Sequence, residues 1–192
     1  MSADAIFQVT KALRLRLEQV AGAGSVFVGP LDDPDVGSAS LILFLYRITP
    51  NASLRNREHR VPSGAPASPV ALFRNALPLD LYFLLTVGKT SGPSEEFLLK
   101  TLGAAMQALQ RDPDLTGVEV GYETVHLSLD PLSTDETSRI WALFPTANYR
   151  TSIAYLATPV WIDPKQPELG AAPVRTDRLD VGASATPQEV DQ

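Results

Sequence analysis

The segment from Asp112 to Glu123 has the residue spacing of a calcium-binding loop. Asp112, Asp114, Gly117 and Glu123 occupy positions 1, 3, 6 and 12 of the pattern, in which oxygen atoms surround the ion. Position 5 holds Thr116 instead of the usual Asp or Asn. The motif also needs a helix after the loop, whereas the following residues alternate like a strand. A helix-to-strand turn is therefore the preferred interpretation, and a calcium-dependent enzyme or regulator stays an alternative.

A second chemical pattern, Gly88-Lys89-Thr90, follows a strand and partly matches a phosphate-binding loop. The full pattern needs another glycine five residues before Gly88, where Phe83 stands. Without that glycine the backbone cannot wrap around phosphates. A polar turn is the preferred interpretation, and nucleotide binding is kept as an alternative.

The remaining residues give little support for catalysis. His59 and His126 lie far apart, and neither has a ligand or nucleophile at a diagnostic spacing. The chain has no cysteine, which excludes thiolate metal sites and cysteine nucleophiles. The carboxylate pair Asp135 and Glu136 is explained by helix capping. We expect no enzyme, no metal or other cofactor, and no small-molecule substrate.

An arginine cluster stands out in a stretch, residues 49–77, that reads as irregular. Arg55, Arg57 and Arg60 lie there beside a single acid, Glu58. Long loops without structure are uncommon in compact domains and are often functional or disordered. One interpretation is a solvated loop. The other is an arm that docks on an acidic surface, such as that of a neighbouring copy.

These residues are positioned by an expected α+β domain, with three helices covering a single mixed sheet of about five strands. Apolar residues at helical spacing predict helices, and runs that are apolar on both faces predict buried strands. The expected helices span residues 4–21, 94–111 and 133–144. The expected strands span residues 26–28, 40–48, 79–87, 118–129 and 152–162.

Local signals refine these elements. Ser94 is expected to cap the second helix, and Ser133 with Glu136 forms a capping box for the third. Pro159 cannot donate a ladder hydrogen bond, so it predicts an edge or a bulge in the last strand. The strand at 118–129 changes the face on which its apolar residues lie, which predicts a bulge near residues 123–124.

Length and charge limit the possible classes. The 192 residues are 20% charged and 44% hydrophobic, which fits a single folded domain. We expect this domain to span residues 1–163 and a Pro-rich extended tail to span residues 164–192. Within the tail, residues 174–181 are a candidate strand. The net charge of −6 argues against binding to nucleic acid. The charge is uneven, because residues 1–78 carry 8 Lys and Arg against 6 acids, while residues 79–192 carry 8 against 16.

No membrane segment or export signal is visible. The longest apolar block, Leu41–Tyr46, is far shorter than the roughly 18 residues that a spanning helix needs. The expectation is a protein that begins in the cytoplasm and, if it leaves, does so without a recognisable signal.

A long aromatic-rich string runs from Trp141 to Pro164 (WALFPTANYRTSIAYLATPVWIDP). It resembles the hallmark segment of the cap, or tail-terminator, proteins of extracellular contractile injection systems, of the Photorhabdus virulence cassette and antifeeding prophage type. Three further segments resemble that family in the same order: Leu43–Asn51, Pro78–Thr86 and Leu127–Ser133. The resemblance covers about residues 5–164 and leaves the tail out.

The resemblance implies a tail-terminator domain that assembles as a six-fold ring. Such a ring closes the distal end of inner tube and sheath, stops polymerisation and anchors the sheath. The implied partners are copies of the chain, the sheath protein and the inner tube protein. All of them would belong to a phage-tail-like particle that is assembled in the cytoplasm, and release of the particle by lysis stays open. The family offers no catalytic residue. A baseplate or tube adaptor of the same particle is a further alternative.

Three residues in the resembling string match the types that anchor protein interfaces: Phe144, Tyr149 and Arg150. Together with Arg55, Arg57 and Arg60 they are the expected interaction residues. Trp141 is instead expected to pack its helix on the sheet.

Overall fold

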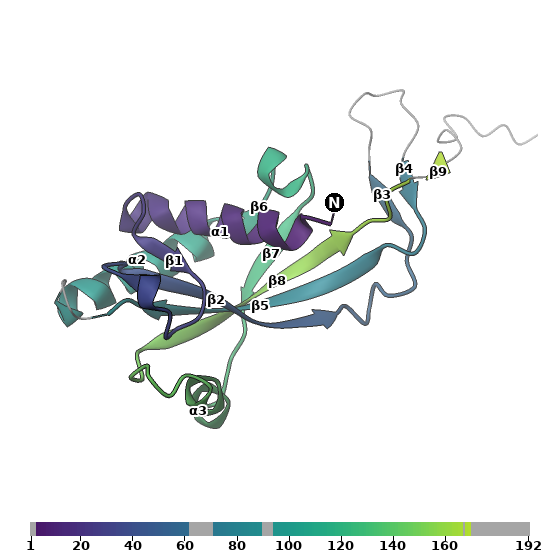
Figure 1. Cartoon of the computed structure of the whole chain (residues 1–192). Coiled ribbons are helices and arrows are strands. Elements are labelled where there is room, and N and C mark those ends of the chain that lie inside the picture. Colours follow the sequence, from purple (N-terminus) through teal and green to yellow (C-terminus); the bar gives the residue numbers. More distant parts are fainter. Residues whose placement is uncertain (1–2, 62–70, 90–93, 167, 170–192) are drawn as a thin grey trace, which may run out of the picture.

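The centre of the molecule is a six-stranded sheet in the order β1–β2–β5–β8–β7–β6 (Figure 1). The structure is a computed structural model and describes residues 3–61, 71–89, 94–166 and 168–169. Strand β1 runs parallel to β2, whereas the other neighbours are antiparallel, so the sheet is mixed as predicted. The strands are β1 (Val26–Val28), β2 (Leu41–Pro50), β5 (Leu77–Val87), β6 (Asp114–Leu115), β7 (Val125–Leu129) and β8 (Ser152–Ile162).

Three helices cover this sheet, which confirms the predicted α+β class. In Figure 1, α1 (Ala5–Ala21) and α2 (Glu95–Arg111) lie on one face and α3 (Thr134–Ala142) lies on the other. Two short 3-10 helices, η1 (Pro34–Val36) and η2 (Val118–Val120), lie in the connections. No helix in the described ranges is long and apolar enough to cross a membrane.

The two faces of the sheet carry separate hydrophobic cores. Leu41 and Leu43 of β2 pack into the core under α1 and α2, while Ile42 between them packs into the core beside α3. Successive side chains of a strand point to opposite faces, so a strand covered on both sides is apolar at every position. This explains the continuous apolar runs at residues 41–46 of β2 and 81–85 of β5.

A second, three-stranded sheet lies at one end of the molecule and was not predicted. It has the order β3–β4–β9, with β3 (His59–Val61), β4 (Ala71–Phe73) and β9 (Glu168–Leu169) all antiparallel (Figure 1). The prediction of an irregular stretch over 49–77 was therefore wrong at β3 and β4. Strands of two or three residues carry no visible periodicity, and β4 also pairs with β9, far away in the sequence.

The predicted strand over residues 118–129 was wrong in its first half. Residues Val118–Val120 form η2, and only Val125–Leu129 forms a strand. Gly117 and Gly121 have φ angles of 94° and 65°, which take the chain out of extended geometry on either side of η2. A turn, rather than a bulge, therefore causes the apolar residues to switch from one face to the other.

The feature predicted at Pro159 is a bulge. Leu79 pairs with Val160 and Leu81 with Ala157, so two residues of β8 oppose one of β5. Strand β7 pairs with β8 only from Tyr155 to Thr158, so Pro159 also lies just beyond that pairing, at a local edge of β8.

The predicted helix caps are confirmed. The Ser94 hydroxyl accepts a hydrogen bond from the Phe97 N–H, and Ser133 forms the capping box with Glu136. Helix α3 ends at Ala142, two residues before its predicted end. The candidate strand at 174–181 and most of the predicted tail lie outside the described residues, so the domain boundary at residue 163 stays a prediction.

Candidate functional site

The predicted arginine cluster lies at the end of the molecule that carries the small sheet. Arg55 and Arg57 lie in the turn between β2 and β3, which we name the arginine turn (residues 51–58), and both side chains are exposed. Arg60 lies on β3 and is also exposed. Glu58 is 3.5 Å from Arg60 and 3.6 Å from Arg74. Among the described residues, Arg55 and Arg57 have no ion-pair partner.

Asn51 fixes the arginine turn to the main sheet. Its amide donates hydrogen bonds to the Asp80 carboxylate (2.8 Å) and to the Thr158 hydroxyl (3.2 Å), and its side-chain oxygen accepts one from Leu54 N–H (3.0 Å). Thr158 lies in the β8 bulge, opposite Asp80. These hydrogen bonds tie the first residues of the arginine turn to β5 and β8.

The other predicted interaction residues lie in the connection between α3 and β8. Phe144 is half-buried and packs edge-to-face on Phe44, with ring centroids 5.2 Å apart. Tyr149 is 66% exposed. The Arg150 guanidinium donates hydrogen bonds to the backbone oxygens of Leu31 (3.0 Å) and Val87 (3.2 Å), and burial lowers its pKa. Phe144 and Arg150 thus make internal contacts while staying partly exposed, and Tyr149 offers the most accessible aromatic surface of the three.

Trp141 packs α3 on the sheet, as predicted. It is 6% exposed, and its indole N–H donates a hydrogen bond to the Ser152 hydroxyl at 3.2 Å. The Arg150 guanidinium lies 5.4 Å from the centre of the indole ring, a cation–π distance.

The two partial motifs do not form sites in the described part of the chain. Asp114 binds the His126 ring at 2.7 Å, while Glu123 contacts His59, so the acids of the calcium pattern face different partners. A Cβ at Gly88 would lie 1.7 Å from the backbone oxygen of Ala39. This glycine is required by strand packing rather than by a phosphate. Thr90 lies outside the described residues.

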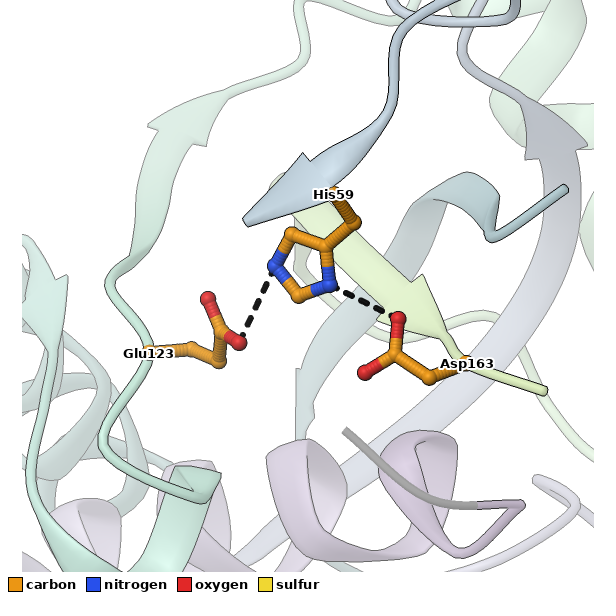
Figure 2. Close-up of side chains that lie close together, drawn as sticks. All are labelled: His59, Glu123 and Asp163. Carbon is orange, nitrogen blue, oxygen red and sulfur yellow. Dashed lines mark hydrogen bonds and ion pairs between the residues drawn. The ribbon is translucent and has the colours of Figure 1, made fainter. Parts of the chain in front are cut away.

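The structure brings together one polar cluster that sequence reasoning missed. His59 of β3 lies between Glu123, before β7, and Asp163, directly after β8 (Figure 2). The distances are 2.7 Å from Nδ1 to Asp163 Oδ1 and 3.1 Å from Nε2 to Glu123 Oε1. No local spacing could reveal this cluster, because the contact between His59 and Asp163 closes 104 residues of chain.

Aromatic side chains cover the same histidine. His59 is 5% exposed and stacks on Trp161 of β8, with ring centroids 4.5 Å apart and planes 7° from parallel. Phe73 of β4 lies 6.2 Å away on a tilted plane. We name His59, Phe73, Glu123, Trp161 and Asp163 the joint, because they connect the small sheet to the main sheet.

Electrostatics favour the charged form of His59. Burial lowers its pKa, but the hydrogen bonds and charges of Asp163 and Glu123 outweigh burial and raise the pKa to about 8. For Asp163, burial raises the pKa, yet the His59 contact contributes to a net lowering. These three residues could approach a metal ion, since one ligand atom of each lies within 4.8 Å of the others. Figure 2 shows, however, that the two carboxylates meet opposite ring nitrogens, as in an ion-paired imidazolium.

Two solved structures share this fold. One is the sheath/tube terminator, in the extended state, of the extracellular contractile injection system PVC, with a TM-score of 0.57, 19% identity, and coverage of 95% of this chain and 65% of that chain. The other is the tube-terminating cap of the anti-feeding prophage, with a TM-score of 0.57, 18% identity, and coverage of 90% and 60%. The chain thus spans less than two thirds of the length of either protein. No curated protein matches it.

A protein family described as the Pvc16 N-terminal domain matches residues 8–176. The match includes both sheets, the arginine turn and the joint. It agrees with the resemblance of residues 5–164 to terminator proteins. The chain therefore belongs to the Pvc16 N-terminal domain family.

Proposed function

We propose that this chain is the terminator, or cap, of a contractile injection system. The observation that carries the proposal is the family match over residues 8–176, together with a fold shared with two terminators of such particles. In this proposal the protein closes the distal end of inner tube and sheath, stops their polymerisation and anchors the sheath there. Its role is structural rather than catalytic.

A six-fold ring is the proposed assembly. Ring closure needs head-to-tail contacts, in which one surface of each copy meets a different surface of the next. The excess of acids in residues 79–192 and the slight excess of bases in residues 1–78 suit such contacts. The exposed Arg55 and Arg57, fixed by Asn51, are the proposed cationic side of one contact, and Arg60 lies beside them.

Exposed apolar side chains offer further surface for partners. Phe7 on α1 is 67% exposed, Val118 in η2 is 71% exposed, and Tyr122 just after η2 is 79% exposed. A shallow depression is lined by Phe7, Lys11 and Val118, among other residues. Large apolar groups left in water at this density are typical of interaction surfaces. We assign them, with Phe144, Tyr149 and Arg150, to contacts with neighbouring copies, sheath or tube.

The proposal places assembly in the cytoplasm of the producing cell. The decisive experiment deletes the gene and measures particles by electron microscopy, with complementation by the wild-type gene as the control. We expect particles of variable length with an irregular distal end. Uniform particles with a normal end would contradict the proposal.

A baseplate or tube adaptor in the same particle is the competing assignment. Gold labelling of a tagged chain separates the two, because a cap lies at the end opposite the baseplate. Label at the baseplate end would replace the terminator assignment by the adaptor. Calorimetry with calcium and with ATP addresses the enzyme or regulator alternative, for which we expect no binding heat.

A further inference from the structure

We propose that the turn around η2 docks on the arginine turn of a neighbouring copy of the chain. We name residues 117–122 the η2 knob; it connects β6 to β7 (Figure 1). The inference rests on the proposed ring and deepens it, because it names the two surfaces that meet in each contact.

The η2 knob carries large apolar side chains in water. Val118 and Tyr122 are 71% and 79% exposed, and Phe7 of α1 is 67% exposed. Phe7 and Val118 line the same shallow depression, so the helix and the knob form one surface. Removing such groups from water is the main favourable contribution to protein association. Their gathering at one place is therefore typical of a surface that another protein covers.

Internal contacts define the shape of the knob. Val120 at its centre is fully buried in the core that also contains α1. The backbone N–H groups of Val120 and Tyr122 both donate hydrogen bonds to the Gly117 oxygen, at 3.2 Å and 2.7 Å. Tyr122 has a φ angle of 61°, a left-handed conformation that bulky residues rarely adopt. The exposed side chains are thus held in place before any partner binds, which lowers the entropy lost on association.

The knob and its surroundings carry an excess of negative charge. Residues 112–123 contain four acids and no lysine or arginine. Three of these acids contact other side chains of the same chain: Asp112, Asp114 and Glu123. Glu119 is exposed and has no ion-pair partner in the described part of the chain. Asp4 and Lys11 line the depression beside it and carry opposite charges, so the knob keeps the charge of Glu119.

The arginine turn offers a surface with complementary properties. Residues 44–60 contain four arginines against one acid, and the exposed Arg55 and Arg57 lack an ion-pair partner among the described residues. Two apolar side chains lie next to this turn, Ile48 just before it and Leu77 at the start of β5, and they are 44% and 45% exposed. Each surface therefore combines exposed apolar groups with an unpaired charge, and the two charges have opposite sign.

This pairing of unlike surfaces suits a ring. A contact between two arginine turns, or between two knobs, would oppose like charges and would end at a dimer. Within one copy the joint links the two surfaces, since His59 directly follows the arginine turn and contacts Glu123, which directly follows the knob. The joint thus constrains the angle between the two surfaces, and that angle sets the number of copies at which a ring closes.

Chemical cross-linking tests the contact, because the chain has no cysteine of its own. The variant Arg57→Cys, Tyr122→Cys is produced in the gene-deletion strain, and isolated particles are treated with a short bismaleimide. We expect a ladder of linked chains that continues beyond the dimer, since each copy contributes one cysteine to each of two neighbours. A ladder that stops at the dimer, or particles that contain the variant as monomers only, would overturn the proposal.

The matched control for cross-linking is Lys100→Cys, Tyr122→Cys. Lys100 is exposed on α2, outside both proposed surfaces, so this variant should give no ladder. A ladder of equal length in the control would show that the reagent links chains without regard to the contact, and the proposal would lose its support.

A charge exchange tests the same contact without cysteines. Glu119→Arg changes an exposed side chain, so it should leave the melting temperature within a few degrees of the wild type and reduce the fraction of particles with uniform length. Combining it with Arg55→Glu and Arg57→Glu restores opposite charges, and we expect this fraction to recover. A folded combined variant that restores uniform length no better than the separate variants would contradict the pairing.

Failure of this inference differs from failure of the terminator proposal. If the tagged cross-linking variant lies at the distal end of the particles but gives no ladder, the protein is a terminator and only the proposed contact is wrong. If deletion of the gene leaves uniform particles with a normal end, the terminator proposal is wrong, and the ring contact is wrong with it.

Discussion

The imidazole ring of His59 lies flat on the indole of Trp161, with ring centroids 4.5 Å apart and planes 7° from parallel. His59 belongs to the small sheet and Trp161 to β8 of the main sheet, so this pair joins the two sheets. An imidazolium over an indole face also gains cation–π attraction. The joint therefore combines apolar burial with charge pairing at one residue.

Replacing Trp161 should weaken the joint. Trp161 is 7% exposed, and Trp161→Leu removes the stacking surface while keeping the position apolar. We expect the free energy of unfolding to fall by about 1–3 kcal/mol, measured by urea denaturation. Phe7→Leu is the control, because that aromatic ring is 67% exposed and its loss should change stability by less than about 0.5 kcal/mol. Equal effects of the two substitutions would show that the stacking adds nothing.

The stability of the chain should depend on pH through His59. The folded pKa is raised from 6.5 to about 8, so the stabilisation is complete below pH 6.5 and is lost as pH rises through 8. The loss amounts to about 2 kcal/mol at most. The lowered pKa of Asp163 acts in the opposite direction: its contribution is present above pH 3.8 and is lost as pH falls through its lower folded value.

Urea denaturation between pH 4 and pH 9 measures this profile. His59→Gln should remove the decline above pH 6.5, whereas His126→Gln should keep it. A decline that persists unchanged in His59→Gln would assign the pH dependence to other groups.

Replacing Gly88 and Gly103 by alanine should have opposite effects on the stability of the chain. Gly88→Ala places a Cβ 1.7 Å from the Ala39 backbone oxygen, so we expect severe loss of folding yield. Gly103→Ala lies in α2 with no atom within 4 Å of the new Cβ, and it should raise the free energy of unfolding by about 0.5–1 kcal/mol. A well-folded Gly88→Ala protein would contradict the close approach of the two strands.

Loss of the Asn51 side chain should loosen the arginine turn. Asn51→Ala leaves Asp80 and the Leu54 N–H without this partner, so we expect destabilisation by about 1–3 kcal/mol. Hydrogen exchange should rise in residues 52–58 before it rises in β5. A uniform increase over the whole chain would mean that Asn51 supports the main sheet rather than the turn.

Charge reversal in the arginine turn should impair assembly without unfolding the monomer. The double variant Arg55→Glu, Arg57→Glu alters two exposed side chains, so its melting temperature should stay within a few degrees of the wild type. In a gene-deletion strain it should restore uniform particle length poorly. The matched control reverses Lys100 and Arg139, two exposed cations on α2 and α3. Full complementation by both variants would remove the arginine turn from the interface.

Much of the fold follows from local signals in the sequence. The three helices, their caps at Ser94 and Ser133, and the long strands β2, β5 and β8 each combine periodicity with a start or stop residue. The resemblance carried by residues 141–164 agrees with the family match. These features can be predicted because the interactions that cause them lie within a few residues of chain or repeat along one element.

Only the tertiary structure decided the small sheet, the turn at η2 and the joint. Strands β3, β4 and β9 are too short to show a pattern, and β9 pairs with a segment almost one hundred residues earlier. His59 reads in the sequence as one polar residue in an arginine-rich stretch. It becomes a buried ion-paired ring because folding brings Glu123, Trp161 and Asp163 around it, and contacts between residues so far apart leave no spacing that sequence reasoning can detect.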